Sequence, residues 1–416
     1  MKIFVSIASY RDPELIPTIQ DCIRKSSNPD KIRIGVAWQH SKDEPKPKGV
    51  GLIDINHLDS RGACWARYRV QQELYNGEDY FLQVDSHMRF TEGWDVVLKD
   101  MLSRCDSDKP VLSSYMGRYN PDKYKDSQFL EEKTWGISSK KFLNKSSIPA
   151  ARPHLIKDMK KPMLNRFMAG GLVFAKGEFV ESVPYDPEIY FIGEEISLAV
   201  RSYTHGYDIF VPDKPIVLHE YGRKGKPKHW TDHTIKNKKK DEAWVSMQLS
   251  GKKRCDFILT ADEKEVQNKA GKWGFGKERT RGQYEKFAGI LFRKKYIHPD
   301  TFEKGHSEDL GHWEYVKPVI SKNKKYIVSY TLKRTESIQD ESQYCCRIAM
   351  LDKNGEVIKV DNLTGKSLDI LRRKEEKHMY EVVETNKVPK SVAIWPYSNS
   401  KGWLDRIVKP LEVSDL

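Results

Sequence analysis

Apolar, strand-like runs alternate with helical segments over the first 90 residues, and this alternation limits the possible folds more than any other feature of the sequence. The strand-like runs are KIFVSIA, KIRIGVAWQH and DYFLQVDSH, and the helical segments between them are PELIPTIQDCIRKSS and CWARYRVQQELYNG. Strands and helices that alternate in this way build βαβ units. The sequence therefore predicts an α/β fold with a mostly parallel sheet and helices on both of its faces.

Two potential metal ligands follow the third strand directly. Residues 80–84 have the apolar composition of a buried strand, and Asp85 and His87 come next. Residues i and i+2 of an extended segment project to the same side, and ligands of open α/β sheets bind beyond the carboxyl ends of the strands. An oxygen and a nitrogen ligand suit Mn²⁺ better than Ca²⁺. Alternatively, Asp85 and Ser86 form a turn that caps a segment at residues 91–105, and these residues alone favour the turn.

Further polar side chains follow other predicted strands at the same edge. The first strand ends in Ser9, Tyr10, Arg11 and Asp12, and the apolar run near residue 217 ends in His219. A carboxylate and two imidazoles around a divalent ion leave room for a diphosphate, and such an ion acts as a Lewis acid on a phosphate leaving group. The sequence contains neither a P-loop nor a dinucleotide fingerprint, which argues against a kinase or a dehydrogenase.

Three other features have both a functional and a structural explanation. The paired glycines Gly170 and Gly171 allow a close approach of the backbone to a ligand, or they form a bulge. The acidic pair Glu194 and Glu195 opens a helix that runs to about His205, where acidic groups also compensate the helix dipole. The basic residues between 223 and 229 neutralise a diphosphate or form a solvated loop, and the two explanations are equally good.

Charge and cysteine content narrow the class of protein. The net charge of +13 fits an acidic ligand or partner, although ordinary lysine-rich solubility explains it about as well. The six cysteines show neither zinc-ligand nor redox spacing, which predicts free thiols in a reducing compartment. The N-terminus lacks a cleavage region, and no apolar stretch is long enough for a membrane span. We therefore expect a soluble, cytoplasmic protein without a membrane partner.

The chain divides into segments of different character. Residues 118–165 are rich in Lys, Ser, Pro and Asn and predict a functional loop or lid. Residues 234–300 predict charged helices. From about residue 316, short apolar runs separated by turn signals predict an all-β module, a sandwich or a barrel.

Six stretches in order give residues 1–300 a specific resemblance to a known family. The chain resembles the GlcNAc-type polypeptide glycosyltransferases of the GT-A fold, whose known members modify a hydroxyproline on a ubiquitin-ligase subunit in the cytoplasm, and more distantly the polypeptide GalNAc-transferases. The matching stretches are SIASYRDPEL, RGACWARYRVQQELYNGEDYFLQVDSHMRFTEGWD, FMAGGLVFAKGEF, FIGEEISLAVRSYTHGYDIF, LHEYGRKGKPKHW and WGFGKERTRGQYEKFAGI.

The resemblance implies a GT-A nucleotide-sugar-binding mixed sheet at residues 1–233 and a helical extension at 234–315. The chain departs from the family after about residue 315, and only the strand pattern predicts a β-rich accessory domain at 316–416. It also implies a metal site for Mn²⁺ (or Mg²⁺) made of an aspartate-any-histidine motif and a distant histidine. The implied metal ligands are Asp85, His87 and His219. The implied donor-binding residues are Ser9, Tyr10, Arg11, Arg61, Arg67, Asp85, Gly170, Gly171, Arg223 and Lys224. Glu194 or Glu195 would hold the sugar or the acceptor as the catalytic residue.

The family further implies transfer of a sugar, with GlcNAc favoured, from a UDP-sugar to a hydroxyl of a macromolecule, with retention of the anomeric configuration. The favoured acceptor is a protein Ser, Thr or hydroxyproline. One alternative is a hydroxymethylated pyrimidine in DNA, in an enzyme of phage type that acts in the host cytoplasm. A non-catalytic alternative is a carbohydrate- or partner-binding protein, and the β module is the part of the chain that suggests it.

Overall fold

The structure, a computed structural model, describes residues 1–124, 134–143, 146–156, 159–223, 225–299, 301 and 324–415. These residues belong to two compact units, Met1–Trp313 and Glu314–Leu416. Each unit has its own hydrophobic core. The units are therefore described separately.

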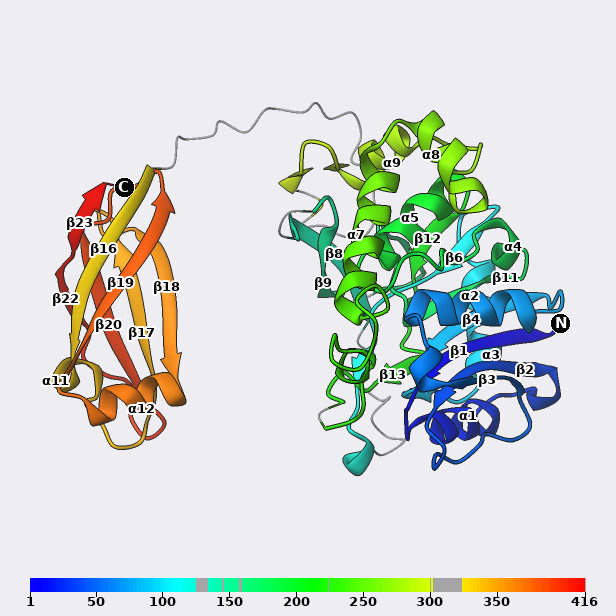
Figure 1. The fold of residues 1–416 in the computed structure, drawn as a ribbon, viewed down its shortest axis with the longest axis horizontal. Helices are drawn as coiled ribbons and strands as arrows, with labels where there is room; N and C mark the ends of the chain where they lie inside the picture. The colour runs from blue at the N-terminus through cyan, green and yellow to red at the C-terminus, as the bar shows by residue number, and fades with distance from the viewer. Residues whose placement is uncertain are drawn as a thin grey trace. The chain divides into compact units, whose positions relative to one another are not determined.

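A mixed sheet of eight strands forms the centre of the first unit (Figure 1). Its order across the sheet is β10 (Met163–Leu164), β12 (Asp208–Val211), β6 (Pro110–Leu112), β11 (Leu172–Lys176), β4 (Tyr80–Asp85), β1 (Ile3–Tyr10), β2 (Ile32–His40) and β3 (Gly51–Asn56). The strands β3, β2, β1 and β4 run parallel, whereas β11 runs antiparallel to both β4 and β6. This reversal brings the start of β11 against the carboxyl end of β4.

Both faces of the sheet are covered by helices because the central strands are apolar on both sides. In β1, Phe4 belongs to one core, while Ile3, Val5 and Ile7 belong to the other. The first core is covered by α2 (Ala63–Glu73), α4 (Phe179–Ser182), α5 (Glu194–Thr204), α7 (Trp244–Thr260), α8 (Glu263–Ala270) and α9 (Arg281–Ala288). The second is covered by α1 (Leu15–Arg24) and α3 (Trp94–Ser103).

Three smaller β structures complete the first unit. One is a three-stranded sheet of β5 (Met88–Phe90), β13 (Val217–His219) and β7 (Gly117–Arg118). Its strand β5 follows β4 directly in the chain. A hairpin is formed by β8 (Thr134–Phe142) and β9 (Pro149–Ile156), and a short pair by β14 (Ile290–Leu291) and β15 (Tyr296–Ile297). The short helix α6 (His229–Asp232) follows β13.

The second unit contains two antiparallel sheets with a shared core. One sheet consists of β19 (Glu376–Thr385), β16 (Lys324–Lys333) and β23 (Glu412–Asp415), and the other of β18 (Val357–Thr364), β17 (Gln343–Leu351), β20 (Ser391–Ser398), β21 (Gly402–Trp403) and β22 (Ile407–Pro410). Alternate residues of β16, β17 and β20 form the core, and Leu368 and Leu371 of α12 (Lys366–Arg373) pack against it. The helix α11 (Arg334–Ser337) follows β16.

The fold class predicted from the sequence, a mixed α/β sheet followed by a β-rich C-terminal region, is confirmed. The segment at residues 118–165, predicted to be a functional loop or lid, contains regular strands that the sequence did not predict, because β8 and β9 form a hairpin of nine- and eight-residue strands there. Buried serines at 138 and 139 occupy positions where apolar residues would have signalled a strand. The part of this segment at 125–133, 144–145 and 157–158 lies outside the described residues.

Candidate active site

Strand register brings the three predicted metal ligands together. Asp85 ends β4, and His87 follows two residues later, just before β5. In the antiparallel pair of β5 and β13, His219 lies opposite Met88, which places it next to His87. One potential ligand atom from each of Asp85, His87 and His219 lies within 4.8 Å of the others.

The imidazole of His87 is oriented by a buried carboxylate. Nδ1 of His87 lies 2.7 Å from Oδ2 of Asp12, and the Ser86 hydroxyl donates a hydrogen bond of 2.6 Å to the same oxygen. Burial opposes the charge on Asp12, but the hydrogen bond and charge of His87 hold the pKa of Asp12 below its usual value. An ionised Asp12 favours the tautomer with the proton on Nδ1, which leaves Nε2 of His87 able to bind a cation.

Asp85 is partly buried among positive and hydrogen-bonding groups. Nη2 of Arg67 donates to Oδ1 of Asp85 at 2.7 Å, and Nε2 of His219 lies 3.1 Å from Oδ2. Burial raises the pKa of Asp85, but the His219 hydrogen bond and the Arg67 charge outweigh it and keep the pKa far below its usual value. Asp85 is therefore ionised, as a metal ligand must be.

The three side chains fit a divalent cation. They offer one carboxylate oxygen and two imidazole nitrogens, a donor set that suits Mn²⁺ better than Ca²⁺ or Mg²⁺. Within the described chain, the buried Nδ1 of His219 has no hydrogen-bond partner. A Cβ on Gly171 would lie 3.0 Å from Oδ2 of Asp85, so the absence of a side chain there keeps that oxygen accessible.

Two cavities, of about 450 Å³ and about 300 Å³, meet at this cluster. The residues that line both are Arg67, Asp85, Phe191, His219 and Tyr221. The smaller cavity extends toward the end of β1 and helix α6, and the larger one toward α5 and the β8–β9 hairpin. The potential cation site thus lies in the wall that the two cavities share.

The two acidic residues at the start of α5 have different surroundings. Arg67 forms an ion pair with Oε1 of Glu194, Tyr185 donates to the same oxygen at 3.3 Å, and the Cys64 thiol donates to Oε2 at 3.3 Å. Glu194 is therefore held by protein groups at both carboxylate oxygens, although burial still raises its pKa. Because Arg67 also binds Asp85, it connects Glu194 to the potential metal ligand.

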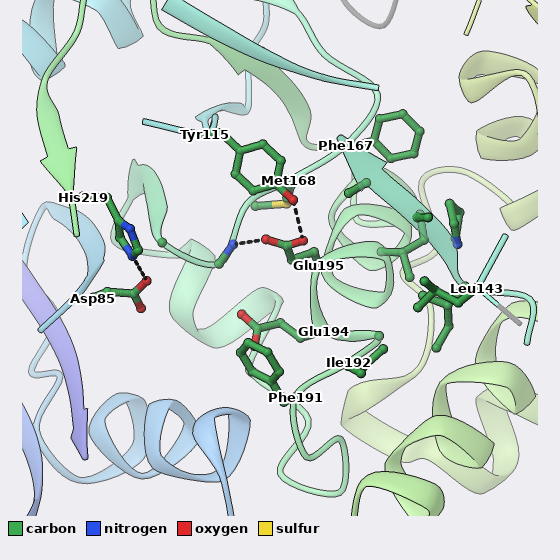
Figure 2. Close-up of a pocket in the computed structure, with 18 of the residues that line it drawn as sticks. Asp85, Tyr115, Leu143, Phe167, Met168, Phe191, Ile192, Glu194, Glu195 and His219 are labelled. Carbon is green, nitrogen blue, oxygen red and sulfur yellow. Dashed lines mark hydrogen bonds and ion pairs between the residues drawn. The ribbon is translucent and has the colours of Figure 1, made fainter. Parts of the chain in front are cut away.

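Glu195 faces the larger cavity. Its Oε1 accepts a hydrogen bond of 3.0 Å from the Gly170 N–H, and its Oε2 accepts one of 3.2 Å from the Tyr115 hydroxyl. Figure 2 shows its carboxylate between Asp85 and His219 on one side and Phe167 on the other. Burial and the neighbouring Glu194 raise the pKa of Glu195 to about 7. This carboxylate is thus placed and poised to exchange protons or hydrogen bonds near neutral pH.

Close packing explains the first of the paired glycines. A Cβ on Gly170 would overlap Oε1 of Glu194 and would lie 2.7 Å from Nη1 of Arg67. Helix α5 itself begins after Gly193, whose φ of +106° is open to glycine and disfavoured for other residues. Gly170 and Gly193 therefore help to fix the positions of Glu194 and Glu195.

Of the remaining residues predicted to bind the donor, some line a cavity and others do not. Tyr10 and Arg223 line the smaller cavity, whereas Ser9 is fully buried in the sheet and does not line it. Arg11 pairs with Glu44 and Asp232 and lines neither cavity, and Arg61 is exposed and also lines neither. Lys224 lies outside the described residues.

The sequence interpretation missed several aromatic residues of the site. Tyr115 and Tyr221 line the larger cavity, and Trp230 lines the smaller one. His229, which belongs to the predicted basic segment 223–229, also lines the smaller cavity. His229 bridges the Tyr190 hydroxyl, at 2.7 Å, and the Ser60 carbonyl, at 3.3 Å; burial and the nearby His233 lower its pKa to about 3. The aromatic residues just after His219 and in the HWTDH stretch were the available signal, but their partners come from distant parts of the chain.

A family model describes most of the first unit. The model of glycosyltransferases (GlcNAc) matches residues 2–51 and 47–294. The chain belongs to this glycosyltransferase family. The predicted enzyme class is thereby confirmed, and so is membership of a GlcNAc glycosyltransferase family, whereas the polypeptide and hydroxyproline subtype stays a prediction. No curated protein matches the sequence.

Some solved structures match the chain at low sequence identity and low TM-score. S. aureus TarS 1–349 in complex with UDP has 15% identity and a TM-score of 0.35, and the match covers 54% of this chain and 61% of that one. This chain therefore spans less than two thirds of that structure. A structure titled S. aureus TarS has 12% identity and a TM-score of 0.35, with 100% and 77% covered. Glucosyl-3-phosphoglycerate synthase from Mycobacterium tuberculosis, in complex with Mn²⁺, UDP-glucose and phosphoglyceric acid, has 12% identity and a TM-score of 0.34, with 61% and 79% covered.

Proposed function

We propose that this glycosyltransferase moves GlcNAc from UDP-GlcNAc to a hydroxyl group of a protein, on Ser, Thr or hydroxyproline, and that it depends on a divalent cation, Mn²⁺ or Mg²⁺. The observation that carries the proposal is the convergence of Asp85, His87 and His219 within 4.8 Å of one another, in the wall shared by two cavities. This arrangement matches the three parts of a nucleotide sugar: the diphosphate would lie at the shared wall, with the nucleoside in one cavity and the sugar in the other.

In this proposal the diphosphate lies at the shared wall. The bound cation would supply Lewis-acid stabilisation of the charge that develops on the leaving diphosphate. Arg223, which lines the smaller cavity and lies 3.5 Å from Asp12, adds positive charge on the same side. The uridine occupies the smaller cavity, where Tyr10 and Trp230 offer aromatic faces.

The sugar and the acceptor hydroxyl occupy the larger cavity. Glu195, and not Glu194, contacts one of their hydroxyls, because Glu194 is buried and paired with the charge of Arg67, whereas Glu195 is only partly buried and bonds to uncharged groups. Glu194 is then a positioning residue that holds Arg67 against Asp85. Gly170 and Gly171 line the same cavity and leave space for the sugar ring.

We further propose that the anomeric configuration is retained, as the family resemblance implies. The acceptor hydroxyl would attack from the face that the diphosphate leaves, and the departing phosphate oxygen would take its proton. No strong protein base is required in such a reaction. Glu195 would then orient a hydroxyl by accepting its hydrogen bond.

The organisation and location of the chain follow as proposals. We assign residues 1–233 as the catalytic domain, 234–315 as its helical extension and 316–416 as an accessory domain. All six cysteines are free thiols, which favours a reducing compartment such as the cytoplasm. Among the described residues, no helix combines the length and apolar character needed to cross a membrane.

The experiment is a turnover assay with a panel of UDP-sugars and Mn²⁺, read as UDP release and as the mass added to peptide acceptors. UDP-GlcNAc should be the preferred donor, and chelation should abolish turnover. The His219→Ala variant should lose activity, whereas His378→Ala, a histidine of the second unit, serves as the matched control. Unchanged turnover after prolonged chelation would refute the metal role, and an inverted anomer in the NMR spectrum of the product would refute retention.

A further inference from the structure

The closed end of the β8–β9 hairpin forms part of the larger cavity. Leu143, Ile148 and Pro149 line it, together with the alanines at 150 and 151. The end of the hairpin is fixed against α7, because Asp256 accepts hydrogen bonds from the Ser146 hydroxyl (2.9 Å) and the Ser147 N–H (2.7 Å). Figure 2 shows Leu143 on the side of the cavity opposite His219. The hairpin therefore borders the site at the end away from the potential cation.

The hairpin and the chain that follows it carry a strong excess of positive charge. From residue 134 to residue 166 the sequence contains eight lysines and arginines and one acidic residue, a surplus of seven in a chain whose net charge is +13. In the hairpin, the side chains of Lys140, Lys141 and Arg152 are exposed. Arg152 pairs in register with Ser138, two residues before Lys140, and it directly follows the cavity-lining Ala151. The exposed charge thus lies beside the mouth of the site.

The interior of the cavity at this end is apolar. Ile148 is buried, as are Phe167 and Met168, which line the same cavity. The charged groups that line the cavity are confined to its centre and its cation end: Arg67, Asp85, Glu194, Glu195 and His219. A group that enters beneath the hairpin therefore meets apolar side chains first and the two glutamates next.

We propose that the β8–β9 hairpin docks an acidic polypeptide segment, so that acidic residues near the modified hydroxyl contact Lys140, Lys141 and Arg152 while the modified residue enters the apolar end of the cavity. This inference rests on the proposed function and specifies its acceptor. Opposite charges at the rim of an interface guide association and set specificity. The apolar walls then accept the aliphatic part of the residue that carries the hydroxyl.

Nucleic acid is the less suitable partner for this surface. A nucleotide acceptor brings phosphodiesters on both sides of the modified base, and the cavity would place them near the carboxylates of Glu194 and Glu195. Repulsion between these phosphates and the two carboxylates would disfavour binding. In a polypeptide, by contrast, the acidic groups can be several residues away from the hydroxyl and can remain at the exposed rim.

The test uses the full chain and two charge-reversal variants of equal net charge. One carries Lys140→Glu, Lys141→Glu and Arg152→Glu. The control carries Lys31→Glu, Lys264→Glu and Lys277→Glu, three exposed residues that do not line either cavity. The probes are a fluorescent peptide with one hydroxyproline among glutamates, its twin with glutamines, and an oligonucleotide with hydroxymethylated pyrimidines. Binding is read by anisotropy at low and at physiological salt, and UDP release without acceptor reports on the donor site.

The parent protein should bind the glutamate peptide about tenfold more tightly than its twin, with a preference that weakens as salt increases. The hairpin variant should lose this preference, whereas the control variant should keep it, and UDP release should be equal in all three. Three results would each overturn the inference alone. The parent could bind the two peptides equally, or both variants could lose the preference equally. The parent could also bind the oligonucleotide more tightly than the glutamate peptide, in a way that depends on the hairpin residues. Failure of the parent to release UDP from any UDP-sugar would instead refute the proposed function, and this inference with it.

Discussion

The protonation of Glu195 should control the acid side of the pH–rate profile. Its ionised form is the hydrogen-bond acceptor that the proposed reaction needs, and its pKa is raised to about 7 by burial and by Glu194. Activity should therefore fall as the pH decreases through about 7. The groups that act on this carboxylate are Glu194 of the same helix, Tyr115, the Gly170 N–H and Arg67 of α2.

The size of the effect follows from the pKa. A group with a pKa of about 7 is ionised to roughly a tenth at pH 6 and to roughly nine tenths at pH 8, so the rate should change about tenfold over this range. In Glu195→Gln this limb should disappear and the maximal rate should fall. In Tyr115→Phe the limb should move to higher pH, because the lost hydrogen bond stabilises the ionised form.

Stability gives an independent measure of the same charge. The folded-state pKa of Glu195 is raised above its ordinary value of 4.5, so its contribution to stability is fully present below pH 4.5 and is lost as the pH rises through about 7. Glu195→Gln should therefore melt at the same temperature as the parent at low pH and at a higher temperature above pH 7.

The assay is UDP release at saturating Mn²⁺ and donor from pH 5.5 to 9, with thermal unfolding measured in the same buffers. Because other groups also contribute to the pH dependence of the rate, only the difference between the parent and Glu195→Gln is diagnostic. Superimposable pH–rate profiles of these two proteins would refute the assignment of the limb to Glu195. A Tyr115→Phe limb that moves to lower pH would contradict the hydrogen-bond argument.

Four further outcomes can be measured with the same protein. His219→Ala should lower turnover about 10²-fold or more and weaken Mn²⁺ binding in calorimetry, and unchanged Mn²⁺ affinity would exclude it as a ligand. Gly170→Ala should displace the Arg67–Glu194 pair and raise the KM for the donor, whereas an unchanged KM would show that the pair adjusts freely. Asp256→Ala should cost about 1–3 kcal/mol by leaving two donors of the hairpin end unpaired, and it should raise the KM for the acceptor more than that for the donor. Leu371→Ala should destabilise the second unit by about 2–5 kcal/mol in calorimetry and leave the melting of the first unit unchanged; a shift of both would indicate a shared core.

Local sequence was sufficient to predict the sheet edge that carries the site. The strands around residues 3–10 and 80–85 are apolar on both sides, and a polar residue can end such a strand only where it leaves the core. Asp85 therefore appears at the strand end by composition alone. The contribution of His219 depends on the pairing of β5 with β13, which joins segments more than 120 residues apart. The end of an apolar run made His219 a candidate, but local sequence could not show that it meets Asp85 and His87.

The roles of Glu194 and Glu195 could not be separated from the sequence. Adjacent residues of a helix point about 100° apart, so Glu194 pairs with Arg67 of α2 whereas Glu195 bonds to the Gly170 N–H and the Tyr115 hydroxyl. Which is which depends on the rotation of α5 about its axis, and this is fixed by packing at Gly193 and Cys255 rather than by local pattern. Similarly, the β8–β9 hairpin lacked the apolar alternation of a strand, since Ser138 and Ser139 occupy buried positions.

The two ends of the larger cavity differ in the exposure of the charged residues beside them. The cation end is built from β4, β5 and β13, where a shift of one residue would separate His219 from His87. At the other end, the β8–β9 hairpin contributes Ile137 and Ile148 to the core, and Asp256 of α7 binds Ser146 and Ser147, but the charged side chains of the two strands are exposed. Under the proposed function, substitutions of these exposed residues should therefore change acceptor binding without disturbing the donor site. For this reason the acceptor is best sought through the charge of the hairpin.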